Sequence, residues 1–298
     1  MAQLWRQPPS PFTEPVAQDD FALCGRDARA FRFRQGVEGR EHAVVCLAGM
    51  GANGRSFARQ APLATTWPFY LLNTPNETPE GIDPIAFAAD AVEEFIAHER
   101  LVRPILLASS FGGAVAATVA LRHPARLGGL VMADAVVSRW QIPLAFPGFV
   151  DLIDAPEPLA RLVSPLAVQL MGGFRLDRAA RDEIVREARI IHPDELKLRL
   201  QALLRIDLLP QLRALTVPSL CIHGSRDLLV PWRRGRRLAD VLGGVFVRIR
   251  GAGHLPYLTH AAAFNQAVAR FLHTFTTGTT GTTGTAGADS WSNDQIRA

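Results

Sequence analysis

The feature that most constrains the fold of this chain is a segment without charged residues, residues 105–121. A hydropathy window could interpret such a segment as a membrane span. However, Ser110 and Gly112 interrupt its middle, and Arg103 and Arg122 flank it. A buried strand, a sharp turn and a buried helix explain this arrangement better. We therefore predict a strand that leads directly into a helix within the protein core, and no membrane span.

Strand and helix patterns alternate along much of the chain. Apolar runs typical of strands and amphipathic runs typical of helices follow one another on both sides of the uncharged segment. An antiparallel hairpin, residues 21–24 with 30–33, is expected to open the fold. The expected strands then lie at 43–47, 69–72, 105–108, 130–132, 219–222 and 245–249, and the expected helices at 84–97, 112–122, 232–242 and 261–273. This order predicts the α/β class, with a mostly parallel sheet and helices on both of its faces.

The alternation stops between residues 138 and 213, where the pattern is helical and punctuated by prolines. We interpret this block as a helical cap inserted between two core segments, residues 21–137 and 214–274. It is expected to cover the carboxyl ends of the strands, where open α/β sheets bind ligands. Residues 1–20 are expected to form an irregular arm. Residues 275–298 include a Thr/Gly repeat that buries too little apolar surface to fold, so a disordered tail is predicted.

The composition argues against several other classes of protein. The chain has 32 basic and 28 acidic residues, and a net charge of +4 gives no electrostatic footprint for nucleic acid. Cys24, Cys46 and Cys221 lie far apart, without the spacing of a metal site or of a disulfide framework. The N-terminal residues contain no apolar signal region, so a cytoplasmic enzyme with reduced thiols is expected.

The turn inside the uncharged segment has the sequence A-S-S-F-G, residues 108–112. A serine nucleophile on a strand-to-helix turn needs small residues two positions away on either side, because strand and helix approach each other closely. Ala108 and Gly112 meet this need for Ser110. A leucine and a phenylalanine occupy the corresponding places around Ser109. Ser110 is therefore the candidate nucleophile.

This turn resembles the nucleophile elbow of the α/β-hydrolase superfamily, with alanine where glycine is commonest. Two later segments resemble the other catalytic segments of that family: Asp227 follows a strand-like run in the sequence H-G-S-R-D, and His254 follows the sequence G-A-G after the last expected strand. The resemblance implies a triad of Ser110 as nucleophile, His254 as base and Asp227 as orienting acid, in the chain order of the family. This chemistry requires no cofactor and no metal.

The family also places a carboxylate elsewhere in some members. Asp134 follows the expected strand at 130–132 and is therefore the alternative acid, although the sequence around Asp227 matches the family better. His223, which lies beside Gly224 at the end of a strand, is interpreted as a structural histidine.

The loop L-A-G-M-G, residues 47–51, resembles the family's oxyanion-hole loop, with Ala48 where a histidine is usual. The resemblance implies that the backbone N–H groups of Met50 and Phe111 form the oxyanion hole. Because these donors belong to the backbone, the hole can survive the loss of that histidine.

Substrate contacts are less constrained by the sequence. The turn at residues 73–79 departs from the acidic, glycine-rich turn of many relatives, so the pocket is expected to differ from theirs. Asn73 is a candidate contact, and the alternative is that it belongs to a plain turn. Further candidates are the apolar cap residues Phe146, Phe149, Met171 and Phe174, which could instead form the ordinary core of the cap.

The predicted function is hydrolysis of a carboxylic ester, thioester or lactone, with a small-molecule acyl substrate. The same triad could instead support carbon–carbon bond hydrolysis, acyl transfer or cofactor-free peroxidation. A low-turnover ligand-binding protein that keeps the fold is a further alternative.

Overall fold

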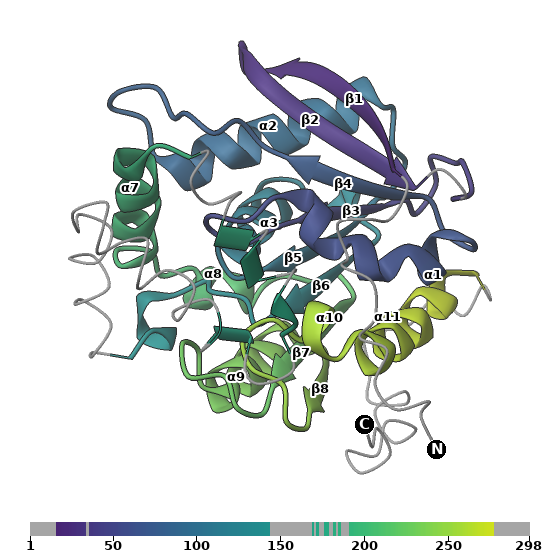
Figure 1. Ribbon diagram of the computed structural model, residues 1–298, viewed down its shortest axis with the longest axis vertical. Helices are drawn as coiled ribbons and strands as arrows, with labels where there is room; N and C mark the ends of the chain where they lie inside the picture. The colour runs from purple at the N-terminus through teal and green to yellow at the C-terminus, as the bar shows by residue number, and fades with distance from the viewer. Residues whose placement is uncertain are drawn as a thin grey trace.

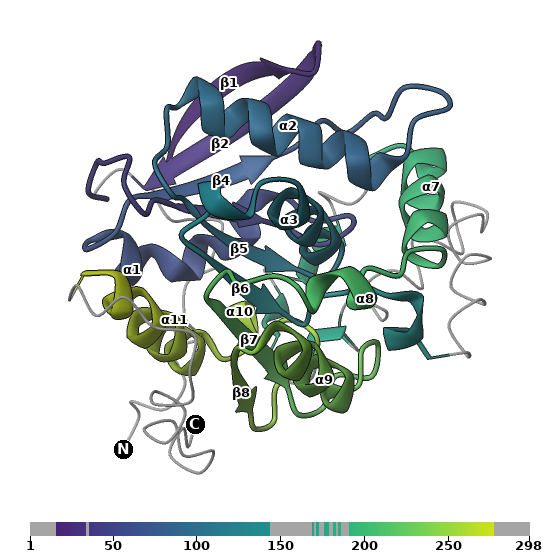
Figure 2. The ribbon, with the colours of Figure 1, turned by 180° about the vertical axis from the view of Figure 1, so that it is seen from behind.

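The computed structural model describes residues 16–33, 36–143, 169, 171–172, 176–178, 181–182, 184–185 and 191–276. These residues form an eight-stranded sheet with helices packed on both faces (Figures 1 and 2). In their order across the sheet, the strands are β1 Val16–Leu23, β2 Arg26–Phe33, β4 Phe69–Asn73, β3 Val44–Leu47, β5 Ile105–Ser109, β6 Gly129–Ala133, β7 Ser219–Gly224 and β8 Val245–Ile249. Strand β2 runs antiparallel to both of its neighbours, and the remaining pairs are parallel. The predicted mostly parallel α/β sheet is confirmed.

Two apolar layers pack against the two faces of the sheet. The helices of one layer are α2 Pro84–His98, α3 Phe111–Arg122, α8 Leu209–Leu212 and α9 Trp232–Leu242. Those of the other are the 3-10 helix η2 Gly54–Gln60, α1 Ala61–Ala64, α10 Pro256–Thr259 and α11 Ala261–Thr276. Helix α7, Pro193–Leu203, contacts α2 and α3, and short 3-10 turns occupy Pro124–Arg126 (η3) and Arg139–Gln141 (η4). The helices on both faces are thereby confirmed as well.

The uncharged segment of the sequence forms β5 and α3, as predicted. Every residue of β5 is buried, because a central parallel strand is covered by helices on both faces. None of the helices described by the structure is both long enough and apolar enough to cross a membrane.

The first strand begins earlier than the sequence pattern indicated. Strand β1 starts at Val16 and pairs with β2 along its whole length, so the expectation that residues 16–20 belong to an irregular arm is wrong. This strand lies at the edge of the sheet, where one side has no neighbouring strand, so its polar residues Gln18, Asp19 and Asp20 remain exposed or half-buried. An edge strand tolerates such residues, and the apolar alternation that identifies inner strands is weak in it.

The C-terminal helix also extends beyond its expected end. Helix α11 reaches Thr276, whereas the core was expected to end at residue 274. Residues 277–298 lie outside the described residues, as does most of the predicted cap between 144 and 190. Within the block whose pattern is helical, α7 occupies Pro193–Leu203.

Gly112 shows how closely α3 approaches the neighbouring strand. A Cβ atom added to Gly112 would lie 2.4 Å from the carbonyl oxygen of Leu47 and 2.8 Å from that of Ala48. Backbone atoms cannot move aside easily, so only glycine fits here. The close packing that the sequence motif implies between elbow and strand is therefore present at this position.

Replacing Gly112 with alanine is expected to lower the free energy of unfolding by about 1–3 kcal/mol, because the added methyl group overpacks a rigid contact. Thermal or chemical denaturation monitored by circular dichroism measures the change. Thr118→Ala, on the half-buried side of the same helix, serves as the control and should cost less. Equal stability of the Gly112→Ala protein and the wild type would contradict the close approach.

Candidate active site

The segments with expected chemical roles meet at the carboxyl edge of the parallel strands. Ser110 follows β5, Asp134 follows β6, and the loops after β7 and β8 carry Asp227 and His254. The loop with Met50 follows β3, which pairs with β5. Because the β3–β5–β6–β7–β8 strands are parallel neighbours, residues far apart in the sequence emerge side by side.

Ser110 occupies the sharp turn between β5 and α3. Its backbone has φ 51° and ψ −116°, in a region that residues other than glycine rarely adopt. The turn is held by the neighbouring strand β6 and the loop after it: the N–H of Ser110 donates to Ala133 O (3.3 Å), and its carbonyl oxygen accepts from the N–H of Val136 (3.1 Å). Ser110 is half-buried, whereas Ser109 is completely buried. Of the two serines, only Ser110 combines a strained turn with access from outside.

The loop after β3 lies against this turn. A Cβ atom on Gly49 would be 3.1 Å from the Cβ of Ser110, so the loop backbone passes directly beside the candidate nucleophile. Phe111 begins α3, and the first N–H groups of a helix have no partner within the helix. The residues predicted to form the oxyanion hole, Met50 and Phe111, thus lie on the two segments that flank Ser110.

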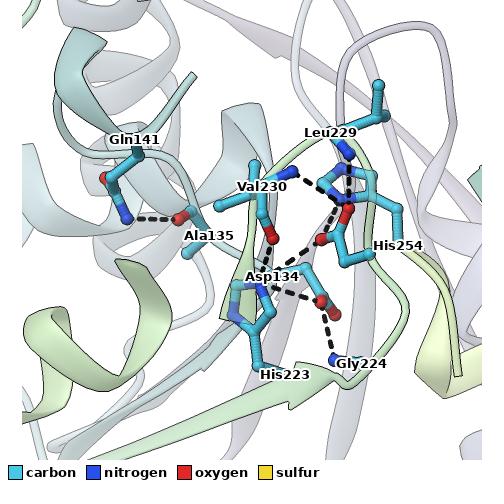
Figure 3. Close-up of polar contacts among 9 residues, drawn as sticks. Asp134, Ala135, Gln141, His223, Gly224, Leu229, Val230 and His254 are labelled. Atoms are coloured by element: carbon cyan, nitrogen blue, oxygen red, sulfur yellow. Dashed lines mark hydrogen bonds and ion pairs between the residues drawn. The ribbon is translucent and has the colours of Figure 1, made fainter. Parts of the chain in front are cut away.

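Asp227 and His254 form a buried pair. The Nδ1 atom of His254 is 2.7 Å from Oδ2 of Asp227, and the other carboxylate oxygen accepts from the backbone N–H groups of Leu229 (2.8 Å) and Val230 (3.0 Å) (Figure 3). The side chains are 3% and 0% exposed. Burial opposes ionisation, but the interactions with His254 and His223 outweigh it and hold the pKa of the Asp227 carboxyl below its usual range.

The loop that carries His254 is fixed by close backbone contacts. The N–H of His254 donates to the carbonyl oxygen of Met171 (2.6 Å). A Cβ atom on Gly253 would lie 2.4 Å from the same oxygen, and a Cβ on Gly224 would lie 2.0 Å from the carbonyl oxygen of Gly253. The glycines around the histidine therefore allow β7, the histidine loop and Met171 to approach one another.

Asp134 and His223 extend the buried pair into a cluster. The Nε2 atom of His223 is 2.7 Å from the carbonyl oxygen of Val230, 3.3 Å from Oδ2 of Asp227 and 3.4 Å from Oδ1 of Asp134 (Figure 3). Polar atoms of Asp134, Asp227 and His254 lie within 4.8 Å of one another. The structure thus brings both candidate acids to the same histidine pair. The interpretation of His223 as purely structural overlooked its contacts with the carboxylates, although its position at the strand end was a usable signal.

The two carboxyl groups differ in their hydrogen bonds. Asp134 Oδ1 accepts from the N–H of Gly224 (2.9 Å), but Oδ2 is buried without a hydrogen-bond partner. Burial raises the pKa of the Asp134 carboxyl well above its usual range, and the nearby Asp227 carboxylate adds to the effect. Asp227 has donors at both oxygens and is therefore better placed than Asp134 to carry a negative charge.

The loop after Asp134 is held by a side-chain amide. Gln141 donates from Nε2 to the carbonyl oxygen of Ala135 (3.0 Å; Figure 3). Its Oε1 accepts from the N–H groups of Val137 (2.7 Å) and Ser138 (3.0 Å). This bonding fixes the backbone that also contacts the Ser110 turn.

The candidate substrate contacts have different environments. Asn73 ends β4, and its Oδ1 accepts from the N–H of Gly54 (2.5 Å), so this oxygen anchors the segment after the oxyanion loop. Met171 is half-buried and contacts His254 through its backbone. The remaining three predicted contacts, Phe146, Phe149 and Phe174, lie outside the described residues.

A cavity of about 710 Å³ opens beside the elbow. Its walls come from the β1–β2 turn, the loop after β3, the turn after β4, the first turns of α3 and the region of α7. Asn73, Ala48 and Phe111 line it, and so does Arg199 of α7, which the sequence interpretation missed. A signal was present, because Glu195 and Arg199 are oppositely charged residues one helical turn apart.

Known proteins are similar to this chain in sequence and in fold. A pimeloyl-(acyl-carrier protein) methyl ester esterase of Edwardsiella ictaluri is 30% identical over 240 residues, which cover 76% of this chain and 92% of that protein. The enzyme of the same name from Neisseria meningitidis serogroup C is 28% identical over 260 residues, which cover 79% and 95% of the two chains. Among solved structures, an esterase from Rhodococcus sp. ECU1013 superposes with a TM-score of 0.75 at 19% identity, over 87% of this chain and 98% of that chain.

A family model provides the broader match. The model described as the alpha/beta hydrolase family aligns with residues 44–267, which run from β3 into the first half of α11 and include every candidate catalytic residue. The relatives named above are ester hydrolases, and the sheet has the mostly parallel order described above. This chain belongs to the α/β-hydrolase family.

Proposed function

We propose that the protein hydrolyses carboxylic esters, including thioesters or lactones, through an acyl-enzyme on Ser110. The observation that carries this proposal is the buried His254–Asp227 pair, joined at 2.7 Å, at the same sheet edge as the strained Ser110 turn. Acyl transfer requires a serine nucleophile and a histidine that is oriented by an ionised carboxylate, and both groups are carried by loops at this sheet edge.

The proposed reaction has two halves. Ser110 Oγ attacks the ester carbonyl carbon while His254 Nε2 takes its proton, and the N–H groups of Met50 and Phe111 stabilise the developing oxyanion. The tetrahedral intermediate collapses, the C–O bond breaks, and the protonated His254 gives its proton to the leaving alcohol. Water, deprotonated by His254, then releases the acid and restores Ser110. Asp227 holds the imidazole and stabilises its charged form in both halves.

The relatives indicate which esters to test first. They are named for methyl ester hydrolysis on an acyl chain attached to a carrier protein. We infer that simple methyl esters of medium-length acyl chains are suitable first substrates for this protein. Its small-molecule substrate would reach Ser110 from the cavity beside the oxyanion loop.

Covalent labelling tests the proposal directly. A fluorophosphonate is expected to inactivate the protein with one label per chain, and peptide mass spectrometry should locate that label on Ser110. A panel of p-nitrophenyl esters, methyl esters, a thioester and lactones should show turnover that is lost in step with labelling.

Other outcomes separate the alternatives. Stoichiometric product release followed by very slow turnover would favour a ligand-binding protein over an enzyme. If the label is found on another residue and the Ser110→Ala protein still turns over the esters at the wild-type rate, Ser110 is not the nucleophile.

A further inference from the structure

Arg199 is a buried arginine on the wall of the cavity. Its side chain is 7% exposed, and its guanidinium lies over the ring of Phe111, 5.4 Å from the ring centre. Phe111 directly follows the candidate nucleophile. The arginine and the first residues of α3 therefore line the same cavity.

Groups of the protein accept hydrogen bonds from only some of the N–H donors of the Arg199 guanidinium. Nε donates to Oε1 of Glu195 (2.6 Å), and Nη2 donates to the carbonyl oxygen of Pro75 (2.8 Å). The other amino group, Nη1, has no hydrogen-bond partner in the described part of the chain, yet it is not fully enclosed by protein atoms. A guanidinium has five N–H donors, so donors remain for a ligand.

The counter-ion of Arg199, Glu195, does not line the cavity. Glu195 also accepts from the N–H (3.0 Å) and the hydroxyl (2.9 Å) of Thr78, and neither Glu195 nor Thr78 is part of the cavity wall. The carboxylate thus accepts from Arg199 and from two donors of Thr78. Because only the arginine of this ion pair lines the cavity, a ligand there meets the Arg199 guanidinium and its remaining N–H donors.

We propose that Arg199 binds a second oxygen acceptor on the substrate, a carboxylate or a carbonyl group on the part of the ester that extends into the cavity. The preferred substrates would then be esters with a polar acyl or alcohol portion, rather than plain alkyl esters. A cavity of about 710 Å³ has room for such a portion. This inference rests on the proposed ester hydrolysis at Ser110.

Three methyl esters of equal chain length test the inference: methyl octanoate, monomethyl suberate and the ω-amide of monomethyl suberate. A charged hydrogen bond to the substrate is expected to raise kcat/KM for the suberate ester about 10- to 100-fold over the octanoate ester. The amide, a neutral acceptor, should lie between them. The comparison of monomethyl suberate with its ω-amide thereby distinguishes binding of a carboxylate from binding of a neutral carbonyl group.

Removing Arg199 alone would leave Glu195 buried without its partner, so the variant to use is Glu195→Gln/Arg199→Gln. It replaces the ion pair with two amides and should bring the three kcat/KM values to within about threefold of one another. The matched control is Arg236→Gln/Asp240→Asn, which removes an exposed ion pair with the same i,i+4 spacing on α9 and should leave the ranking unchanged. Circular dichroism and thermal melts check that both variants fold.

Binding to the Ser110→Ala protein separates this inference from the proposed function. Isothermal titration should give a lower Kd for monomethyl suberate than for methyl octanoate, with the difference lost when Glu195→Gln/Arg199→Gln is added. If no ester is turned over but this difference in Kd is present, ester hydrolysis fails and the Arg199 site stands. If all three esters are hydrolysed and bound equally well, or if the preference survives in the double variant, the Arg199 inference is overturned and the proposed function stands.

Discussion

Ser110→Ala should lower kcat by about 10⁶-fold and leave the protein folded. The alanine removes the only atom that can form the acyl-enzyme, and residual hydrolysis would then depend on the oxyanion hole and on binding alone. The side chain is small and half-buried, so little packing is lost. Steady-state kinetics on the best ester of the panel gives the rate, and a thermal melt gives the stability.

Ser109→Ala is the matched control, because it removes the same hydroxyl group one residue earlier. Ser109 belongs to β5 and is completely buried, out of reach of a substrate. This variant is expected to retain catalysis. If Ser109→Ala is inactive in a folded protein while Ser110→Ala works normally, the nucleophile has been assigned to the wrong serine.

Asp227→Asn should lower kcat by about 10⁴-fold. Oδ2 of Asp227 accepts the bond from His254 Nδ1, and an amide at this place would remove the negative charge that stabilises the imidazolium. An amide NH₂ group facing Nδ1 would also favour the wrong tautomer of the histidine. The measurement is kcat at a pH where the wild type is fully active, with a thermal melt as the folding control.

Asp134→Asn provides the comparison for Asp227→Asn. Because burial raises the pKa of Asp134 and its Oδ2 has no donor, we expect this carboxyl to be protonated in the resting protein. Asparagine then replaces one neutral group with another and should change kcat only severalfold. An inactive Asp134→Asn protein together with a nearly normal Asp227→Asn protein would move the acid to the end of β6.

The fold class could be predicted from the sequence because its signals are local. A central parallel strand shows as an uninterrupted apolar run, and amphipathic helices show a helical period, as in β5 and α2. The edge strand β1 gave no such signal, since its polar residues are tolerated only because one side of it has no neighbouring strand. Its beginning at Val16 therefore became evident only in the sheet.

The candidate nucleophile was also a local prediction. The close approach of strand and helix requires small residues two positions before and after Ser110. The structure shows why at Gly112, where an added Cβ atom would collide with the carbonyl oxygen of Leu47. The resemblance to a known family added Asp227 and His254, because their segments carry short glycine-containing motifs. The oxyanion-hole donors and the substrate contacts remain predictions.

Other properties of the site depend on groups that meet only in the folded protein. The sequence offered two acids, but the charge of each depends on its donors: Leu229 and Val230 donate to Asp227, whereas one oxygen of Asp134 is left without any. Likewise, Arg199 looks like one residue of a surface helix until α7 packs against Phe111 and the turn after β4. The sequence by itself determined the fold class and the candidate nucleophile, because periodicity and steric fit act over a few residues. Only the tertiary structure decided how differently the two carboxyl groups are hydrogen-bonded and that Arg199 lines the cavity, because desolvation and hydrogen bonding there come from segments distant in the chain.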